Sequence, residues 1–544
     1  MKVVCKLSNL LGIVGAVLIC GFAMPTFANP SEVSLFHKCY GILTGTRPPF
    51  NHRILTQVQT GAVSASQGCM QVFDLAQIQA NGRTLGENSP VVAQDAEDAK
   101  NILRQFQTFH KSWFPSQVFR EATGTLFDKP YSDVFSTYEI ANLVSYIMLT
   151  NQPYENLVTG NQVVKELREG QPGRTDGPPS FGHTFKNAIE AFTDTLGAAF
   201  SPLFLEVGRL RGIAPLSSGE LSQTIRFSMG ANNVFPSAGD PYGVSYTNVN
   251  NNDSRNEIVE IPYRKSIGAG GIGSPSYLIL NMDGVRNLGL SRATGGNITW
   301  RRLVTSVYRD IMCRSLPVVN SGDANSYVRL ASTLPYRSNS TCMSCHASID
   351  GGAAAFRNLS LGEIASNPRA NPNGFEGGHN VVFGVIEHPT AYTAVTAPVT
   401  PPSYTRLQQI RWMKREGGNA IFTAAEADIF SVDYDNQFFK RVPNGKVFYR
   451  DINNQLIDQN VQGVEAFGQT LAQIDDLYVC AAKRYFRYMT GYDASMLEVP
   501  NSSEAEVAAR DFVVEIGKRL KSHQSLRDLI AEIIQSDYFK DGVQ

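Results

Sequence analysis

The sequence predicts a mainly α-helical protein with more than one domain. Apolar residues recur at alternating steps of three and four over several segments, which is the spacing of one face of an α-helix. Ser and Glu at capping-box spacing precede two of these segments. Long stretches rich in Gly, Pro and Asn separate the helical segments. Because 544 residues exceed the size of one ordinary core, we expect at least two domains.

Two helices are expected in the first half of the chain. The apolar face of the first consists of Ile102, Phe106, Phe109 and Trp113. A capping box of Ser136 with Glu139 begins the second, whose apolar face consists of Ile140, Leu143, Val144, Ile147 and Met148. We expect both faces to pack in a core. A run of helix breakers over residues 169–182 predicts a surface connection, and residues 257–263 have the composition of a strand.

Four helices are expected in the second half. The first runs from about Trp300 to Cys313 and ends before Pro317, and the second runs without interruption from about Val464 to Met489. The apolar face of this second helix consists of Phe467, Leu471, Ile474, Tyr478, Ala481, Tyr485 and Met489. Ser503 and Glu506 cap the third, and Leu526, Leu529, Ile530, Ile533 and Ile534 line the last. A connection rich in Pro, Gly and Asn is expected over residues 366–405.

Residues Cys342-Met343-Ser344-Cys345-His346 form a C-x-x-C-H box. This spacing lets two thiols add across the vinyl groups of a haem while the imidazole ligates the iron. We therefore expect one covalent haem c on Cys342 and Cys345, with His346 as the proximal iron ligand. A thioredoxin-like dithiol and a zinc half-site are the alternatives. Neither is favoured, because the sequence has no second C-x-x-C, no H-x-x-x-H and no βαβ pattern around the box.

The ligand on the other side of the iron stays open. His379, His388 and Met413 lie between the box and the last core helices, and Met489 lies on an apolar helical face. An open or water-bound position is the remaining alternative. The choice separates two classes of function, because a saturated iron exchanges electrons whereas an open iron binds oxygen or peroxide.

The N-terminal segment, residues 1–28, has the pattern of a secretory signal peptide. Lys2 and Lys6 supply positive charge, an apolar segment spans residues 10–22, and Thr26-Phe27-Ala28 is a small-x-small cleavage site. A lipid anchor at Cys20 is disfavoured because Ile19 occupies a position that requires a small residue. We expect a periplasmic or secreted chain without a transmembrane segment after cleavage.

Four cysteines remain outside the signal peptide and the box: Cys39, Cys69, Cys313 and Cys480. An even number in an oxidising compartment predicts two disulfides. Pairing Cys39 with Cys69 closes the shorter loop and Cys313 with Cys480 the longer one, and the two other pairings stay open. The 48 Lys and Arg and the 49 Asp and Glu are mixed along the chain, so we expect no nucleic-acid partner.

Several further motifs surround the box in a fixed order. They are Gly268-Ala269-Gly270-Gly271-Ile272-Gly273-Ser274-Pro275, Trp300-Arg301-Arg302, Cys313-Arg314-Ser315-Leu316-Pro317, Ile349-Asp350 after the box, the segment 480–491, Leu526-x-x-Leu529-Ile530 and Ser536-Asp537-Tyr538-Phe539. In this order residues 265–540 resemble planctomycete-type cytochromes. The resemblance implies a secreted, redox-active monohaem protein of helical fold. The chain departs from the family's Pro-Leu-Gly after Ile-Asp, because residues 351–355 are Gly and Ala here, and we expect its haem-edge surface to differ.

We therefore expect three parts: the signal peptide at 1–28, a mainly helical domain at 29–264 and a cytochrome c-like helical haem domain with long loops at 265–544. The expected function is electron transfer with another periplasmic redox protein, in which no side chain acts as acid or base. One alternative is a haem-dependent oxidoreductase of the peroxidase or oxygenase type with its substrate site in 29–264. The chain length favours this, since an electron shuttle needs about a hundred residues. The other alternative is a haem-containing binding or surface protein.

Overall fold

The computed structural model describes residues 30–115, 138–168, 209–216, 218, 224–229, 257–262, 267–274, 276–278, 281, 295–330, 335–356, 359–365, 380–387, 443–496 and 502–542. Most of these residues are helical, which confirms the predicted class. Within the same ranges no helix has both the length and the apolar character needed to cross a membrane. The predicted signal peptide and the breaker-rich run at 169–182 lie outside the described residues.

The helices of the first half are α1 (Pro30–Thr44), α2 (Arg53–Gln59), α3 (Ala65–Asp74), α4 (Leu85–Asn88), α5 (Ala93–Lys111), α8 (Glu139–Leu149) and α9 (Asn156–Thr159). The helices of the second half are α13 (Gly295–Met312), α14 (Ser321–Ala324), the 3-10 helices η4 (Asn325–Tyr327) and η5 (Pro335–Ser338), α15 (Ser340–Ala354), α18 (Gly463–Ala472), α19 (Asp475–Thr490), α20 (Glu504–His523), α21 (Leu526–Gln535) and α22 (Asp537–Lys540).

The described strands form four antiparallel two-stranded sheets. They are β1 (Val164–Arg168) with β2 (Leu210–Pro215), β3 (Thr224–Met229) with β4 (Glu257–Pro262), β5 (Leu359–Ala365) with β6 (Asn380–Glu387), and β7 (Asn444–Arg450) with β8 (Leu456–Gln462). Strand β4 confirms the strand expected at 257–263. Strand β6 corrects the expected loop at 366–405, because residues 380–387 are rich in Val, Phe and Ile and pair with β5.

Helices α5 and α8 coincide with the two apolar faces predicted in the first half. Ile102 and Phe106 are fully buried, and every residue of α8 is buried. Glu139, the acidic residue of the capping box predicted for α8, has a different partner from the one expected. Its carboxylate accepts the backbone N–H of Ser276 (3.2 Å). Its expected partner Ser136 lies outside the described residues. The helix therefore begins against a segment that is distant in the sequence.

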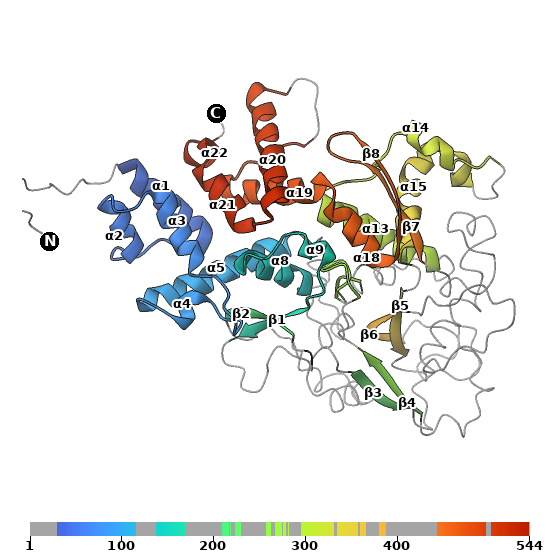
Figure 1. Ribbon diagram of the computed structural model, residues 1–544, viewed down its shortest axis with the longest axis horizontal. Helices are drawn as coiled ribbons and strands as arrows, with labels where there is room; N and C mark the ends of the chain where they lie inside the picture. The colour runs from blue at the N-terminus through green and yellow to red at the C-terminus, as the bar shows by residue number, and fades with distance from the viewer. Residues whose placement is uncertain are drawn as a thin grey trace, which may run out of the picture.

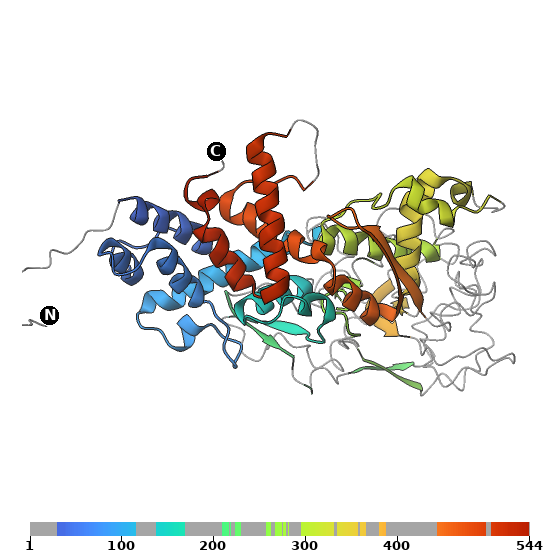
Figure 2. The ribbon, with the colours of Figure 1, turned by 45° about the horizontal axis from the view of Figure 1, so that its top comes forward.

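One continuous hydrophobic core contains side chains from both halves of the chain. Figures 1 and 2 show α1–α5 at one end, α15 with the β7–β8 hairpin at the other, and α19–α22 between them, next to α8. Polar contacts follow the same packing: Tyr154 donates its N–H to Gln524 O (2.9 Å), and the guanidinium of Arg527 pairs with Asp74 (2.7 Å). The last helices of the chain thus stabilise the first.

The uninterrupted helix predicted over 464–489 is wrong, although all seven residues of its apolar face are buried. The chain leaves the helix at Gln473–Ile474, and α19 begins at Asp475. One tertiary and one local hydrogen bond hold this break: Asp476 accepts the N–H of Ile452 (3.0 Å), and the Tyr478 hydroxyl donates to Ala472 O (2.7 Å). Two carboxylates in the first turn of α19 also suit the positive end of a helix dipole.

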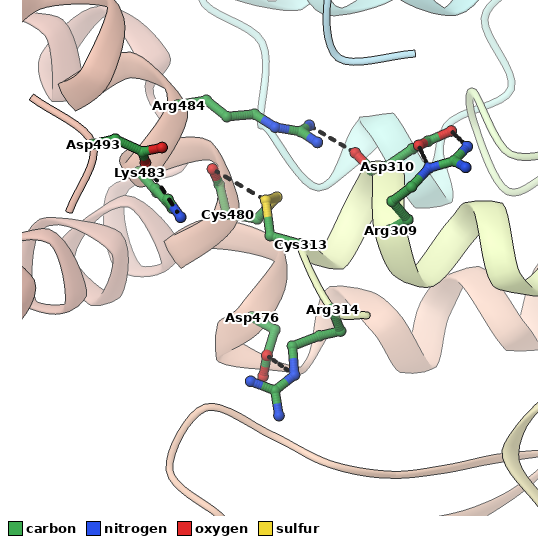
Figure 3. The surroundings of a disulfide bond; sticks show 9 residues. All are labelled: Arg309, Asp310, Cys313, Arg314, Asp476, Cys480, Lys483, Arg484 and Asp493. Atoms are coloured by element: carbon green, nitrogen blue, oxygen red, sulfur yellow. Dashed lines mark hydrogen bonds and ion pairs between the residues drawn. A yellow bond between two sulfur atoms is a disulfide. The ribbon is translucent and has the colours of Figure 1, made fainter. Parts of the chain in front are cut away.

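The four remaining cysteines form two pairs. Cys39 on α1 pairs with Cys69 on α3, and Cys313 just after α13 pairs with Cys480 on α19, with Cα atoms 6.1 Å and 5.3 Å apart. These separations lie within the range for disulfides. Figure 3 shows the surroundings of Cys313 and Cys480, with Arg314 directed at Asp476 on one side of the bond. The second disulfide therefore ties α13, the helix that precedes the box, to α19.

Stability should depend on pH through Asp476. Burial, together with the charge of Asp451, raises the pKa of Asp476 to about 6, although Arg314 opposes the shift. Because the folded pKa exceeds the unfolded one, this carboxyl contributes stability that is fully present below about pH 4 and is lost as the pH rises through about 6. We expect Asp476→Asn to remove this dependence. Relative to the wild type, its free energy of unfolding should be higher at neutral pH than at pH 4, by on the order of 2 kcal/mol.

Urea unfolding of the wild type and of Asp476→Asn across this pH range checks the prediction. Asp475→Asn is the matched control. Burial alone would raise the pKa of Asp475, but its ion pair with Lys521 (2.7 Å) lowers it. Because the pKa of Asp475 is lowered in the folded protein, its carboxylate stabilises the wild type at neutral pH, and this stabilisation is lost as the pH falls. Asp475→Asn should therefore remove a pH dependence of the opposite sign. Equal pH profiles for the wild type and Asp476→Asn would contradict the assignment.

Candidate haem-attachment site

The C-x-x-C-H box lies in the first two turns of α15. The side chain of Asn339 caps this helix, because it accepts the backbone N–H of Thr341 (2.8 Å). Cys342, Cys345 and His346 stand at positions i, i+3 and i+4 and therefore share one helical face. The opposite face carries residues that are packed in the core, including Met343 and Ala347, which are buried.

The box is held between α13, α14 and the β7–β8 hairpin, which all pack against α15. Trp300, buried on α13, donates its indole N–H to Leu359 O just beyond α15 (3.2 Å). A side chain at Gly352 would meet Val304 of α13 at 2.7 Å, so glycine permits the close approach of the two helices. Ala353, Ala354 and Ala355 are buried as well. The Gly and Ala residues at 351–355, which depart from the family's pattern, thus lie mostly in the core. Their main effect is on the packing of α15 and not on the surface at the haem edge.

A polar shell adjoins the imidazole of His346. Its Nδ1 lies 3.5 Å from Oδ2 of Asp350, one turn further along α15. The other oxygen of Asp350 accepts from Nε of Arg301, and Nη2 of Arg301 lies 3.2 Å from the hydroxyl of Tyr336. The ring of Tyr336 lies on the imidazole, with 4.2 Å between centroids and 30° between planes. Arg301 comes from α13 and Tyr336 from η5, so three elements meet at His346.

The residues of the box fit the attachment of a haem c. Both thiols are free and partly accessible, and the side chain of His346 is 26% exposed. Because Nδ1 faces Asp350, Nε2 is the nitrogen left for a metal. Two buried polar atoms, Nδ1 of His346 and Oδ2 of Asp350, have no hydrogen-bond partner. Within the described ranges, no group of three or more His, Cys, Asp and Glu side chains is arranged to hold a metal ion.

Three of the four candidates for a sixth iron ligand, His379, His388 and Met413, lie outside the described residues. Met489 is described and is fully buried in the last turn of α19. That helix packs mainly against α20, α13 and α21. In Figures 1 and 2, α19 lies near the middle of the molecule and α15 towards one end.

Sequence reasoning missed the roles of Arg301, Tyr336 and the β7–β8 hairpin. Arg301 and Asp350 belong to motifs that predict no role for either residue, and Tyr336 belongs to no motif. The hairpin carries a usable signal, because the strand-forming run Val447-Phe448-Tyr449 is followed by Asn453-Asn454 at a turn. Nothing local predicts that Tyr336 lies on the ring of His346.

A second polar cluster joins the two halves of the chain. The buried His110 of α5 bonds Ser145 of α8 and Tyr485 of α19, each at 2.7 Å. Burial, with the nearby charge of Arg484, holds the pKa of His110 well below its usual value. Arg484 donates to the backbone oxygen of Asp310 (2.7 Å; Figure 3). The bond between His110 and Tyr485 anchors α19 to the N-terminal helices, and the bond between Arg484 and Asp310 anchors α19 to α13.

No protein-family model matches the sequence, and no curated protein and no solved structure matches it either. The function is therefore inferred from the residues of the site. Among the described residues, the side chains with the most specific chemistry are the two free thiols and the imidazole on the outer face of α15.

Proposed function

We propose that this protein is a secreted monohaem c-type cytochrome of the planctomycete type, which transfers single electrons to and from another periplasmic redox protein. The observation that carries the proposal is the placement of Cys342, Cys345 and His346 on one accessible face of α15, with both thiols free. A haem attached there would supply a one-electron couple.

Each residue of the box has a distinct task in this proposal. Cys342 and Cys345 form two thioether bonds, which fix the group to one helix, and Nε2 of His346 ligates the iron. The surrounding packing has a task of its own. Trp300 and Val304 of α13 and Phe448 of β7 are buried around α15, so they hold that helix rigidly and keep water from its inner face.

The proposed compartment rests on two features. Haem c is attached outside the cytoplasm, and residues 1–28 have the pattern of a signal peptide. The two cysteine pairs support an oxidising compartment. Cleavage after Ala28 would place the new N-terminus directly before α1, which begins at Pro30.

A haem-dependent oxidoreductase of the peroxidase or oxygenase type is the second candidate. One observation favours it: helices α1–α3, α5, α8 and α9 share a core with α18–α22, although electron transfer alone requires a much smaller chain. The two functions make opposite demands on the sixth position of the iron. An electron carrier needs a position that is filled in both redox states, whereas an enzyme needs one that exchanges its ligand.

Carbon monoxide distinguishes the two functions. We expect the reduced protein to show a sharp low-spin spectrum that carbon monoxide does not change, because a protein ligand fills the sixth position. Of the variants His379→Ala, His388→Ala, Met413→Ala and Met489→Ala, one should bind carbon monoxide within mixing time. Met489→Leu accompanies the last of these, because it retains the core volume while it removes the sulfur. Stoichiometric binding by the unmodified protein would favour the enzyme.

A further inference from the structure

We propose that Asp350 is the positioning residue of the axial ligand: held by Arg301, it accepts the Nδ1 proton of His346, presents Nε2 to the iron and increases the electron donation of the imidazole. This inference rests on the proposed function, because it concerns the iron ligand of that same site. It adds a determinant of the redox potential that lies outside the C-x-x-C-H box.

The geometry of α15 carries the first step. His346 and Asp350 are four residues apart, so their side chains lie on the same face of the helix, one turn from each other. Their facing atoms, Nδ1 and Oδ2, are 3.5 Å apart, and each lacks any hydrogen-bond partner. A hydrogen bond of about 2.9 Å requires these two atoms to approach each other by roughly half an ångström. Forming this bond satisfies both buried atoms at once.

The surroundings of Asp350 carry the second step. Its side chain is fully buried, and a buried carboxylate needs a counter-charge. Arg301 supplies this charge through Nε and binds only Oδ1, so Oδ2 stays directed at the imidazole. The guanidinium also contacts the hydroxyl of Tyr336 (3.2 Å), whose ring lies on the imidazole. His346, Asp350, Arg301 and Tyr336 therefore form a closed ring of contacts that restricts rotation of the imidazole.

The chemistry of the imidazole carries the third step. A neutral imidazole has one protonated nitrogen, and an acceptor at Nδ1 selects the tautomer in which Nε2 is free to bind a metal. A carboxylate is a stronger acceptor than a backbone carbonyl, so it makes the ligating nitrogen more basic. A more basic ligand stabilises the ferric state and lowers the redox potential.

Asp350→Asn tests this role, with Asp323→Asn as the matched control. Asp323 lies on α14, which packs against α15, and it pairs with Arg450 (2.7 Å), so the control removes the same charge nearby without facing the imidazole. We expect Asp350→Asn to retain covalent haem and to raise the ratio of ferrous to ferric protein about tenfold at a fixed ambient potential, which equals about 59 mV for one electron. The ¹⁵N chemical shift of Nδ1 of His346, measured on protein with isotope-labelled histidine, should change in the same variant and stay unchanged in Asp323→Asn.

Other outcomes overturn the inference or the proposed function separately. If wild type and both variants carry covalent haem but Asp350→Asn keeps the wild-type potential and the wild-type chemical shift of Nδ1, Asp350 does not position the ligand. An equal potential shift in both variants, with no change in the chemical shift of Nδ1, would leave charge as the sole cause and also overturn the inference. A wild type without covalent haem overturns the proposed function itself.

A variant that fails to fold still leaves a decisive measurement on the wild type. With isotope-labelled histidine, the Nδ1 proton of His346 should exchange slowly with solvent in the haem-loaded protein, because it is bonded to a buried carboxylate. Rapid exchange of that proton would exclude the bond to Asp350.

Discussion

Replacing Cys342 and Cys345 together by Ala is expected to remove all covalent haem from the protein, because each thioether bond requires one of these thiols. The fold should survive, since both side chains are only partly buried and Ala is a favourable residue in a helix such as α15. Haem staining of a denaturing gel measures attachment after expression with the maturation machinery for c-type cytochromes. Circular dichroism of the same samples measures the helical content.

The control removes the same number of thiols elsewhere. In Cys39→Ala with Cys69→Ala, the disulfide between α1 and α3 is lost while the box is intact, so the haem stain should persist. An unstained wild-type band would remove the basis of the proposed cytochrome. A stained band for the Cys342 and Cys345 double variant would show that the attachment site lies elsewhere in the chain.

The second large effect concerns the disulfide between Cys313 and Cys480. Its cysteines are 167 residues apart, and closing a loop of this length in the unfolded chain contributes about 5 kcal/mol in the chain-entropy model. The bond between Cys39 and Cys69 spans 30 residues and should contribute about 3 to 4 kcal/mol. We therefore expect Cys313→Ala with Cys480→Ala to lower the free energy of unfolding more than the other pair of substitutions.

Chemical denaturation of both double variants beside the wild type tests this order. Reduction of the wild type should cost at least as much as the larger of the two losses. Peptide mapping without reductant gives an independent check, because it should recover the peptides of Cys313 and Cys480 joined. Recovery of both as free thiols, or an equal loss in the two variants, would contradict the expectation.

The helices that the sequence predicted correctly are those with a local cause. Ser503 and Glu506 form the capping box expected at the start of α20, and the apolar face of α21 is buried throughout. In these segments the hydrophobic period and the capping residues lie within a few turns of each other. The side chains of the segment itself are then sufficient to define the element.

The segment 464–489 shows where this reasoning ends. Its apolar period continues unbroken through Gln473 and Ile474, so the sequence predicts one helix. The structure breaks it there, because Asp476 bonds the backbone of Ile452 in the turn of the β7–β8 hairpin. A contact with a neighbouring element decides the local conformation, and the apolar periodicity of the segment does not predict that contact.

The sequence by itself determined the helical class, the buried faces and the position of the box on the chain, since each depends on spacing between near neighbours. The tertiary structure decided which distant residues meet. It joins both halves in one core and brings Arg301 and Tyr336 to Asp350 and His346, although Arg301 lies 49 residues before Asp350. Such contacts depend on the packing of α13, η5 and α15, and packing is a property of the folded chain as a whole.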